Sequence, residues 1–159
     1  MFRIADFRDC QNYGSIIADR VWNAWWKNAG QPLSAVEFHM TEMANEFSLP
    51  TALVAHDNEG YVGSAFVIRC DLEERPQYSP WIAAVWVEQT KRSSGVGSAL
   101  VAEAVKTARL LGYPETYICC LPHLEGFYEA IGFTLIEQNV GAHSLSVLRM
   151  ATDGAGAAE

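Results

Sequence analysis

The sequence predicts an α/β fold of the α+β type, with a mixed, mostly antiparallel sheet of about six to seven strands flanked by about four helices. Residues 81–87 are apolar without interruption, which is typical of a strand covered on both faces, and a Gly- and Ser-rich turn joins them to an amphipathic helix. A length of 159 residues fits one domain. We predict this domain over residues 1–150, with a disordered tail over residues 151–159, which lack apolar anchors.

The start of the chain predicts an edge strand followed by two helices. Residues 2–5 form the strand, and Asp9 is expected to cap a helix that runs to about residue 27. Ser34 and Glu37 match a capping box at the start of the second helix. Three Trp residues crowd the first helix, either as packing or partner residues or as part of a substrate cleft: Trp22, Trp25 and Trp26.

A hairpin leads from these helices to the central strand. Residues 51–56 and 61–69 are expected to pair across a turn in which Gly60 accepts a positive φ. Residues 71–80 follow as a loop that is rich in acidic residues and contains two prolines. This loop leads directly into the strand over residues 81–87.

The central helix and the elements after it complete the sheet. Residues 96–111 carry an apolar stripe at helical spacing. Residues 116–120 are expected to form a strand parallel to residues 81–87, reached through a right-handed crossover. A short helix and a closing hairpin follow, over residues 124–131, 134–138 and 144–150.

The balance of charge argues against two classes of partner. A net charge of −8 and a pI near 4.9 oppose nonspecific binding to nucleic acid or to anionic membranes, and they suit a cationic substrate. No leader-like segment opens the chain and no apolar run is long enough for a membrane helix, so we expect a cytoplasmic protein.

The four Cys residues lack the spacing of a metal site, so we expect no metal. Core positions in a reducing compartment are one interpretation of them, and a redox switch is the other.

The turn before the central helix carries the first chemical signature. Residues 92–97 have the form Arg-x-x-Gly-x-Gly, and Gly95 and Gly97 let the backbone approach a ligand closely. The helix that follows offers free N-terminal amides and the positive end of its dipole, which together favour a phosphate.

A second signature lies downstream, where Phe127 and Tyr128 are followed by Gly132 and Phe133. In this order, the two signatures resemble those of the GCN5-related N-acetyltransferases (GNAT family). The resemblance is specific over residues 81–133. It implies a sheet that splays between its fourth and fifth strands, with acetyl-coenzyme A bound there as co-substrate.

The resemblance also implies how the cofactor is held. Main-chain amides of the turn would hold the pyrophosphate, and strand residues would face the pantetheine and the acetyl group. Ser93 and Ser94 stand where the family often has Gly and a basic residue, so less positive charge and weaker cofactor affinity are expected. The implied cofactor-binding residues are Val85, Val87, Arg92, Ser93, Ser94, Gly95, Val96, Gly97 and Ser98.

Tyr128 stands where the family's usual general acid stands, facing the thioester sulfur. A phenol with an ordinary pKa of about 10 stays protonated at neutral pH and can donate. The base that must deprotonate the amine has no signature of its own. Glu88, His123 and Glu125 are candidates by their nearness in sequence, and a water chain to a distant acid is the alternative.

We therefore expect transfer of an acetyl group from acetyl-coenzyme A to a primary amine of a small, cationic molecule, by direct attack through a tetrahedral intermediate. Asp71, Glu73 and Glu74 either form a fence for this amine or are ordinary solvated loop charges. Acetylation of a protein amine, and a noncatalytic acyl-coenzyme A sensor or interaction module on the same fold, are the alternatives. A nucleotide-phosphate site is less favoured, because Ala99 and Leu100 follow the turn where a Lys and a metal-binding Ser or Thr would stand. A homodimer is left open.

Overall fold

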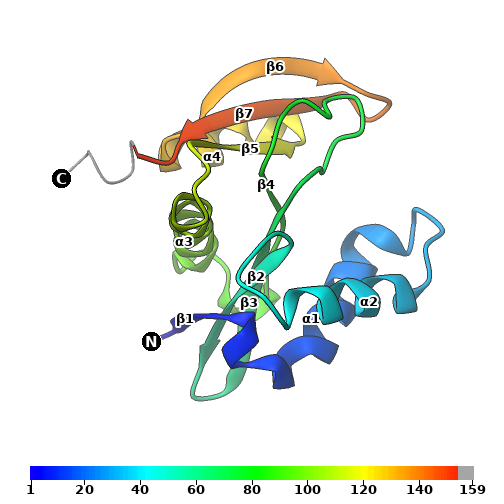
Figure 1. Ribbon diagram of the computed structural model, residues 1–159, viewed down its shortest axis with the longest axis vertical. Coiled ribbons are helices and arrows are strands. Elements are labelled where there is room, and N and C mark those ends of the chain that lie inside the picture. Colours follow the sequence, from blue (N-terminus) through cyan, green and yellow to red (C-terminus); the bar gives the residue numbers. More distant parts are fainter. Residues whose placement is uncertain (154–159) are drawn as a thin grey trace.

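A seven-stranded sheet runs through the protein in the order β1-β2-β3-β4-β5-β7-β6 (Figure 1). The computed structural model describes residues 1–153. The strands are β1 (Arg3–Asp6), β2 (Thr51–Asp57), β3 (Gly60–Ile68), β4 (Trp81–Val87), β5 (Glu115–Cys120), β6 (Thr134–Val140) and β7 (Leu145–Ala151). The α-helices in this part of the chain are α1 (Gly14–Val21), α2 (Leu33–Met43), α3 (Val96–Leu110) and α4 (Glu125–Ile131). The predicted mixed, mostly antiparallel sheet with flanking helices is confirmed.

β4 and β5 separate almost as soon as they meet. They are parallel and share a single pair, Trp81 with Tyr117, whereas every other neighbouring pair of strands is antiparallel and has at least four paired residues. Figure 1 shows the result, with β1 to β4 in one wing and β5 to β7 in the other. We call the divergence of β4 and β5 beyond Trp81 and Tyr117 the fork. The predicted splay between the fourth and fifth strands is confirmed.

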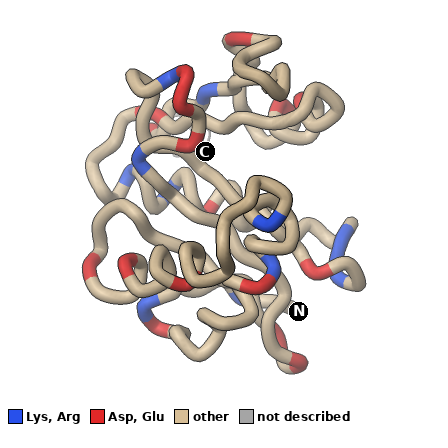
Figure 2. The backbone as a smooth tube through the Cα atoms, turned by 90° about the vertical axis from the view of Figure 1, so that its right-hand side faces the viewer, with Lys and Arg blue, Asp and Glu red and all other residues tan. Residues whose placement is uncertain are grey.

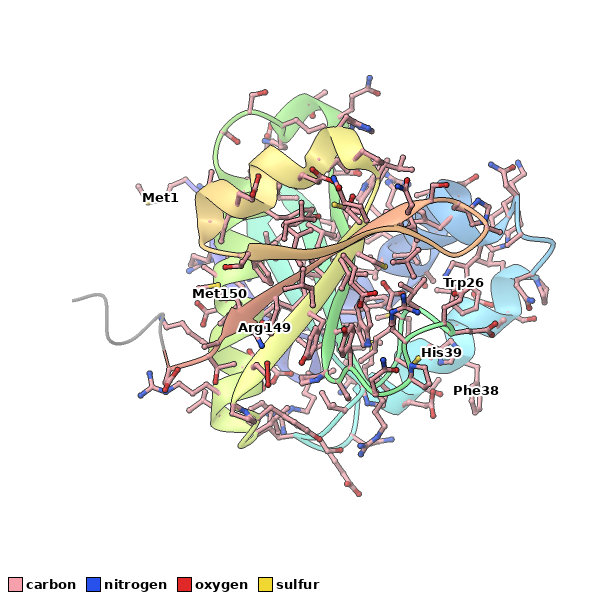
Figure 3. All side chains as sticks on the ribbon, turned by 90° about the horizontal axis from the view of Figure 1, so that it is seen from above. Met1, Trp26, Phe38, His39, Arg149 and Met150 are labelled. Carbon is pink, nitrogen blue, oxygen red and sulfur yellow. The ribbon has the colours of Figure 1, made fainter. Side chains whose placement is uncertain are left out.

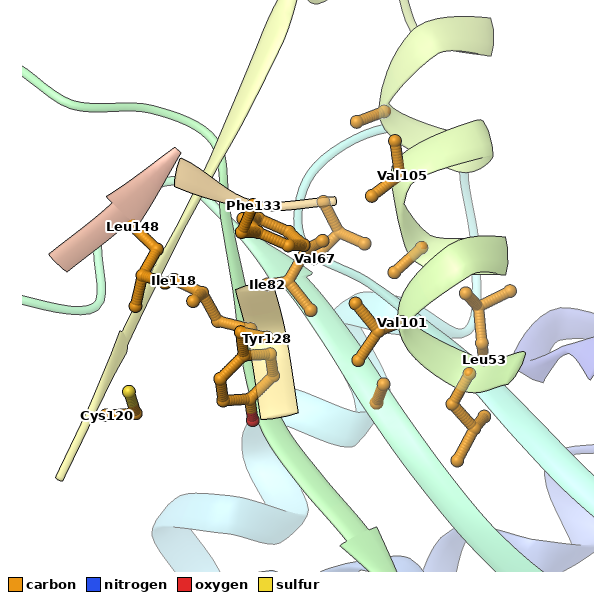
Figure 4. Packing of buried hydrophobic residues seen from close by; sticks show 14 of the residues in the cluster. Leu53, Val67, Ile82, Val101, Val105, Ile118, Cys120, Tyr128, Phe133 and Leu148 are labelled. Carbon is orange, nitrogen blue, oxygen red and sulfur yellow. The ribbon is translucent and has the colours of Figure 1, made fainter. Parts of the chain in front are cut away.

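The buried side chains form three groups, two of which join the two wings. α3 and α4 cover one face and share a core with both wings, part of which is drawn in Figure 4. α1 and α2 cover the other face of the first wing and form a second core with β2, β3 and β4. A third core lies on that same face of the second wing, around Trp81, Tyr117 and Val147. Because side chains alternate along a strand, β4 and β5 contribute to both faces.

A β-bulge decides which way the end of β4 faces. Ala84 and Val85 together oppose a single residue of β3, and Ala84 adopts a φ of 53°. As a result, Val85 and Val87 pack on the same face as Ile82, with α3 and α4. Strict alternation from Ile82 would have turned both valines to the opposite face.

The β3–β4 loop, residues 69–80, crosses from the first wing to the second (Figure 1). Tyr78 stacks on Tyr117 of β5, with ring centroids 4.5 Å apart, and its hydroxyl donates to Glu137 of β6 at 2.6 Å. Arg75 forms an ion pair with the same carboxylate at 2.6 Å. These contacts fix the loop against β5 and β6.

The first helix departs from the prediction. Asp9 does not cap it, because Asp9 ends a short 3₁₀ turn, Phe7–Asp9, which Asp6 caps instead. α1 begins only at Gly14 and passes into a π-helical turn, Trp22–Trp26. The Phe7 side chain is 2% exposed, and its burial anchors the separate first turn, an effect that helical periodicity in the sequence does not report.

The second helix also begins differently. The predicted capping box of Ser34 and Glu37 is not formed, because α2 starts at Leu33 with Pro32 as its N-cap and without a side-chain cap. The ring of Pro32 holds φ at −76°, which prepares the chain to enter the helix at the next residue. Ser34 therefore lies inside the first turn and is not the capping residue.

The start of the predicted tail is wrong for Ala151 and Thr152. Ala151 pairs with Glu115 as the last residue of β7. Thr152 is 2% exposed, and its hydroxyl donates to the carbonyl oxygen of Tyr113 at 2.7 Å. Backbone pairing and one buried hydroxyl thus extend the domain without any apolar anchor. Residues 154–159 of the predicted tail lie outside the described residues.

Gly63 marks a close approach of β3 and β4, and it yields a stability prediction. A Cβ at this position would lie 2.6 Å from the carbonyl oxygen of Trp86 and 3.3 Å from the side chain of Leu100. Because a backbone oxygen cannot move aside cheaply, we expect Gly63→Ala to lower the free energy of unfolding by about 1–3 kcal/mol, measured by urea denaturation.

Gly126→Ala is the matched control for this prediction. Nothing lies within 4 Å of a Cβ added at Gly126, which is in α4. Alanine favours helix over glycine, so this variant should be as stable as the wild type or slightly more stable. Equal stability of the two variants would show that β3 and β4 tolerate a side chain at their closest approach.

Candidate functional site

A cavity of about 410 Å³ opens at the fork. β4 and the turn before α3 line it from the first wing, and α4 lines it from the second. It is lined by Val85, Trp86, Val87, Lys91, Arg92, Ser93, Gly95, Val96, Gly97, Ser98, Leu124, Phe127 and Tyr128.

The turn before α3 has the backbone geometry of an anion site. Ser93 and Gly95 have positive φ values, 64° and 86°. α3 begins directly after them at Val96, and no side chain caps it. Its first amides therefore lack a side-chain partner, and the positive end of a 15-residue helix dipole lies beside the cavity. This arrangement suits a phosphate.

Gly97 has no left-handed φ, and its lack of a side chain leaves space in the cavity. A Cβ at Gly97 would lie 3.4 Å from the Phe127 ring and 3.8 Å from a methyl group of Val87, and both residues line the cavity. Any side chain at this position would therefore enter the cavity between α4 and β4.

Two cationic side chains border the cavity, and both already contact other groups of the protein. The Arg92 guanidinium lies 4.6 Å above the Trp86 ring. Lys91 pairs with Asp57 at 3.0 Å and with Glu59 at 2.5 Å, across the turn between β2 and β3. Lys91 can therefore offer a ligand only part of its charge, and an anion at the turn would depend mainly on backbone amides.

Glu88, one of the candidate bases, follows β4 and is tightly paired. Arg20 of α1 donates to both of its carboxylate oxygens at 2.9 Å, and the Trp86 indole donates at 3.0 Å. The bond from Arg20, followed by that from Trp86, lowers the pKa of Glu88. A carboxylate stabilised in this way is a weak base.

The other two candidate bases are Glu125 and His123. Glu125 accepts hydrogen bonds from Ser146 and Gln138, and these bonds lower its pKa. His123 is exposed in the 3₁₀ turn Pro122–Leu124.

Tyr128 lies at the edge of the core with its hydroxyl turned away from the neighbouring side chains (Figure 4). Its ring packs edge-to-face on Phe127 and Phe133, with centroids 5.0 and 6.2 Å away. Burial, reinforced by Cys120, Cys119 and Asp71, raises the pKa of Tyr128 to about 12. The phenol is therefore protonated at neutral pH, and it borders the cavity.

The three acidic residues of the β3–β4 loop separate in the structure. Asp71 turns toward β5 and accepts a hydrogen bond from the Cys119 thiol at 3.3 Å. Glu73 is exposed. Glu74 lies over the β6–β7 turn, where a Cβ on Gly141 would meet its carboxylate at 2.9 Å. Only Asp71 of the three approaches the end of β5.

Although Asp71 as a residue is exposed, desolvation of its carboxyl raises the pKa to about 6, against a smaller lowering by the Cys119 thiol. Burial, together with Asp71 itself, in turn raises the pKa of Cys119, so this thiol is not prepared to act as a nucleophile.

The prediction from the sequence left out part of the cavity wall. Of the predicted cofactor-binding residues only Ser94 does not line the cavity, and its hydroxyl donates to the carbonyl oxygen of Lys91. Lys91 and Trp86 line it without having been predicted. Phe127 lay within the second signature, so its position beside Tyr128 was the signal that could have identified it.

Aromatic residues of the first wing lie beside the same site. Trp25 is 45% exposed and meets the Trp86 ring edge-to-face at 6.4 Å. Trp26 instead packs on His39, 5.3 Å away, and Figure 3 shows both on the α2 side of the molecule with Phe38. Of the three Trp residues considered in the sequence, Trp25 is the one in contact with the cavity wall.

Charge and metal ligands are dispersed over the chain. Figure 2 shows acidic and basic positions interspersed along the tube. Within residues 1–153, no three His, Cys, Asp or Glu side chains gather closely enough to hold a metal ion. In the same range, no helix combines the length and apolar character that crossing a membrane requires.

These observations define an α/β protein in which a phosphate-suited turn and a protonated phenol border one cavity at a fork in the sheet. A family model of the acetyltransferase (GNAT) domain matches residues 49–135, so the chain belongs to the GNAT family. The resemblance found in the sequence is confirmed. No curated protein matches the chain by sequence.

Solved structures of low sequence identity share the fold. An aminoglycoside 6'-N-acetyltransferase complexed with coenzyme A has a TM-score of 0.72 at 17% identity, covering 94% of this chain and 97% of that chain. Mutant forms of the spermidine/spermine N-acetyltransferase SpeG from Vibrio cholerae have a TM-score of 0.72 at 11% identity, covering 100% and 99%. An aminoglycoside 6'-acetyltransferase type Ii has a TM-score of 0.70 at 19% identity, covering 94% and 97%.

The environment of Asp71 predicts an unusual dependence of stability on pH. Its carboxyl is protonated below about pH 6 in the folded protein, but only below about pH 4 in the unfolded chain. Between these values the folded state binds more protons, so this group lowers stability as the pH rises. Asp71→Asn stays neutral, and we expect it to be more stable than the wild type at about pH 7.5, with the difference vanishing below about pH 4. Urea unfolding over this range measures the difference, and a pH-independent loss of stability would contradict it.

Proposed function

We propose that this protein is an N-acetyltransferase that moves the acetyl group of acetyl-coenzyme A to a primary amine of a small, cationic molecule. One observation carries the proposal: the glycine turn at the α3 N-terminus and the phenol of Tyr128 border the same cavity. A donor with its phosphates at the turn and its thioester near Tyr128 would use both features. The match to the GNAT family supports this reaction class.

The cofactor would be held mainly by backbone. Amides of residues 92–98 would bind the pyrophosphate, and Val85 and Val87 on the cavity wall would contact the pantetheine. The space left by Gly97 fits a ligand that approaches the main chain closely. The coenzyme A complex of a protein with the same fold supports this assignment.

Two groups of the chain suit the steps of direct attack. The bulge at Ala84 and Val85 leaves backbone without a regular ladder partner, and such an amide could stabilise the oxyanion of a tetrahedral intermediate. Tyr128 would protonate the leaving thiolate as the carbon–sulfur bond breaks. A protonated phenol at this position has no use in a passive sensor, which is why we favour the enzyme over the sensor.

The acceptor is the less defined half of the reaction. The net charge of −8 and the carboxyl of Asp71 at the end of β5 suit a cationic amine. Proteins of this fold that are named for aminoglycosides and for spermidine/spermine support a small amine. A protein amine is the alternative. The four free cysteines fit a reducing compartment, and we propose the cytoplasm.

Thiol release from acetyl-coenzyme A, followed across a panel of polyamines, aminoglycosides, amino acids and peptides, tests the proposal. Gly97→Val should abolish both turnover and calorimetric binding of coenzyme A while leaving thermal unfolding close to that of the wild type, because its side chain enters the cavity. Binding of coenzyme A without turnover of any amine would favour the sensor. Unchanged affinity in a folded Gly97→Val protein would remove the cofactor assignment.

Tyr128→Phe keeps the ring and removes only the hydroxyl, so coenzyme A affinity should survive. General acids contribute about 10²–10⁴-fold, and we expect a loss of kcat near the lower end because a thiolate already leaves readily. The alkaline limb of the pH profile should not change below about pH 10, since burial raises the pKa of Tyr128 to about 12.

Tyr113→Phe is the matched control, because it removes a phenol that does not line the cavity. It should keep wild-type kcat. A Tyr128→Phe protein with normal kcat would assign the tyrosine to packing alone.

A further inference from the structure

The chemistry at the fork lacks a base, and none of the three candidates taken from the sequence fills the role. An ammonium group with a pKa of about 10 must lose one proton before attack, and its nitrogen must lose a second proton as the amide forms. A different carboxylate, that of Asp71 in the β3–β4 loop, lies against the end of β5, on the face of the sheet opposite the cofactor cavity. We infer that Asp71 is the general base that accepts the proton of the attacking amine; this inference rests on the proposed acetyltransferase function.

Asp71 and Tyr128 lie on opposite faces of β5. Cys120 packs in the same core as Tyr128, on the α3 and α4 face. Cys119 is the preceding residue and packs with the third core on the opposite face. Because the Asp71 carboxylate is 3.3 Å from the Cys119 sulfur, it lies on this opposite face. An acceptor entering from there would meet Asp71 before it met the thioester.

Asp71 is held in position by its own loop. Leu72, the next residue, is 6% exposed in the third core. Arg75 donates its amide to the carbonyl oxygen of Leu72 at 2.9 Å and anchors the loop on Glu137 of β6. A carboxylate fixed in this way needs little reorganisation to accept a proton, which is a requirement for efficient general base catalysis.

In the described part of the chain Asp71 has no cationic partner, unlike Glu88 and Asp57 near the site. Glu88 is paired with Arg20, and Asp57 with Lys91. Within residues 1–153 no Lys, Arg or His comes within ion-pair distance of Asp71, so an incoming ammonium would be its first counter-charge. The titratable groups that interact with it are the Cys119 thiol on β5 and the Tyr128 phenol on α4.

With Asp71 as the base and Tyr128 as the acid, the protons of the reaction balance. The ammonium loses one proton to water, and its nitrogen then forms the bond to the thioester carbon. The second nitrogen proton passes to the Asp71 carboxylate. The carbon–sulfur bond breaks with its electron pair on sulfur, and Tyr128 gives that sulfur a proton. Asp71 releases its proton to solvent and Tyr128 regains one, so the net products are the amide, the free thiol and one proton. A carboxyl with a pKa of about 6 is a stronger base than an ordinary Asp yet is ionised at neutral pH.

The experiment compares the pH dependence of kcat for the wild type, Asp71→Asn and Cys119→Ala with the best amine of the panel. Asp71→Asn should lower kcat by about 10²-fold and lose the acid limb that the wild type shows near pH 6, with coenzyme A affinity unchanged. Cys119→Ala removes a hydrogen bond that lowers the pKa of Asp71, so its acid limb should move to higher pH while its kcat on the alkaline plateau stays at the wild-type value.

Glu103→Gln, a carboxylate on α3 paired only with Lys106 at 3.8 Å, is the matched control and should retain the wild-type profile. Near-normal kcat in Asp71→Asn, a rise in amine KM without a change in kcat, or a loss of coenzyme A affinity would each overturn the assignment as a base. In all three cases the wild type still acetylates the amine. If the wild type acetylates no amine at all, the proposed function itself fails, and the inference fails with it.

Discussion

The separation of β4 from β5 after one residue pair is the constraint on which the site depends. Two parallel strands that stayed paired would bury their backbone amides in the sheet and leave no room between the wings. Because only Trp81 and Tyr117 pair, the wings diverge, and the cavity forms where α3 and α4 lie across the gap. The wings are held at this angle by the core shared between α3, α4 and both halves of the sheet, and by the β3–β4 loop.

The bulge in β4 makes the fork usable from both faces. By adding one residue at Ala84, it turns Val85 and Val87 toward α3 and the cavity. Trp86 borders the cavity and also reaches the edge of the Trp25 ring and, through its indole, the Glu88 carboxylate. The two faces of the fork therefore present separate sets of residues, as our proposed division between the acyl donor and the amine requires.

Much of this protein is determined by the sequence alone, because the features concerned are local. The apolar run over residues 81–87, the glycines at 95 and 97 and the helical stripe after them specify a strand, a tight turn and a helix that must be neighbours in space. Tyr128, which lines the cavity, could also be identified from the sequence, since it lies within a short signature. Such patterns report backbone requirements and side-chain periodicity over a few turns, and those requirements hold wherever the segment lies.

Only the tertiary structure decided which acidic group lies against β5 and which way β4 faces. A run of apolar residues has no alternation from which the bulge at Ala84 could be read. Glu88 is nearer to the signatures in sequence than Asp71, but Arg20, from a helix far away in the chain, neutralises it. The pKa of Asp71 is raised by desolvation in the folded chain, against a smaller lowering by the Cys119 thiol of β5. Burial and ion pairing depend on segments that are distant in sequence, so no local pattern contains them.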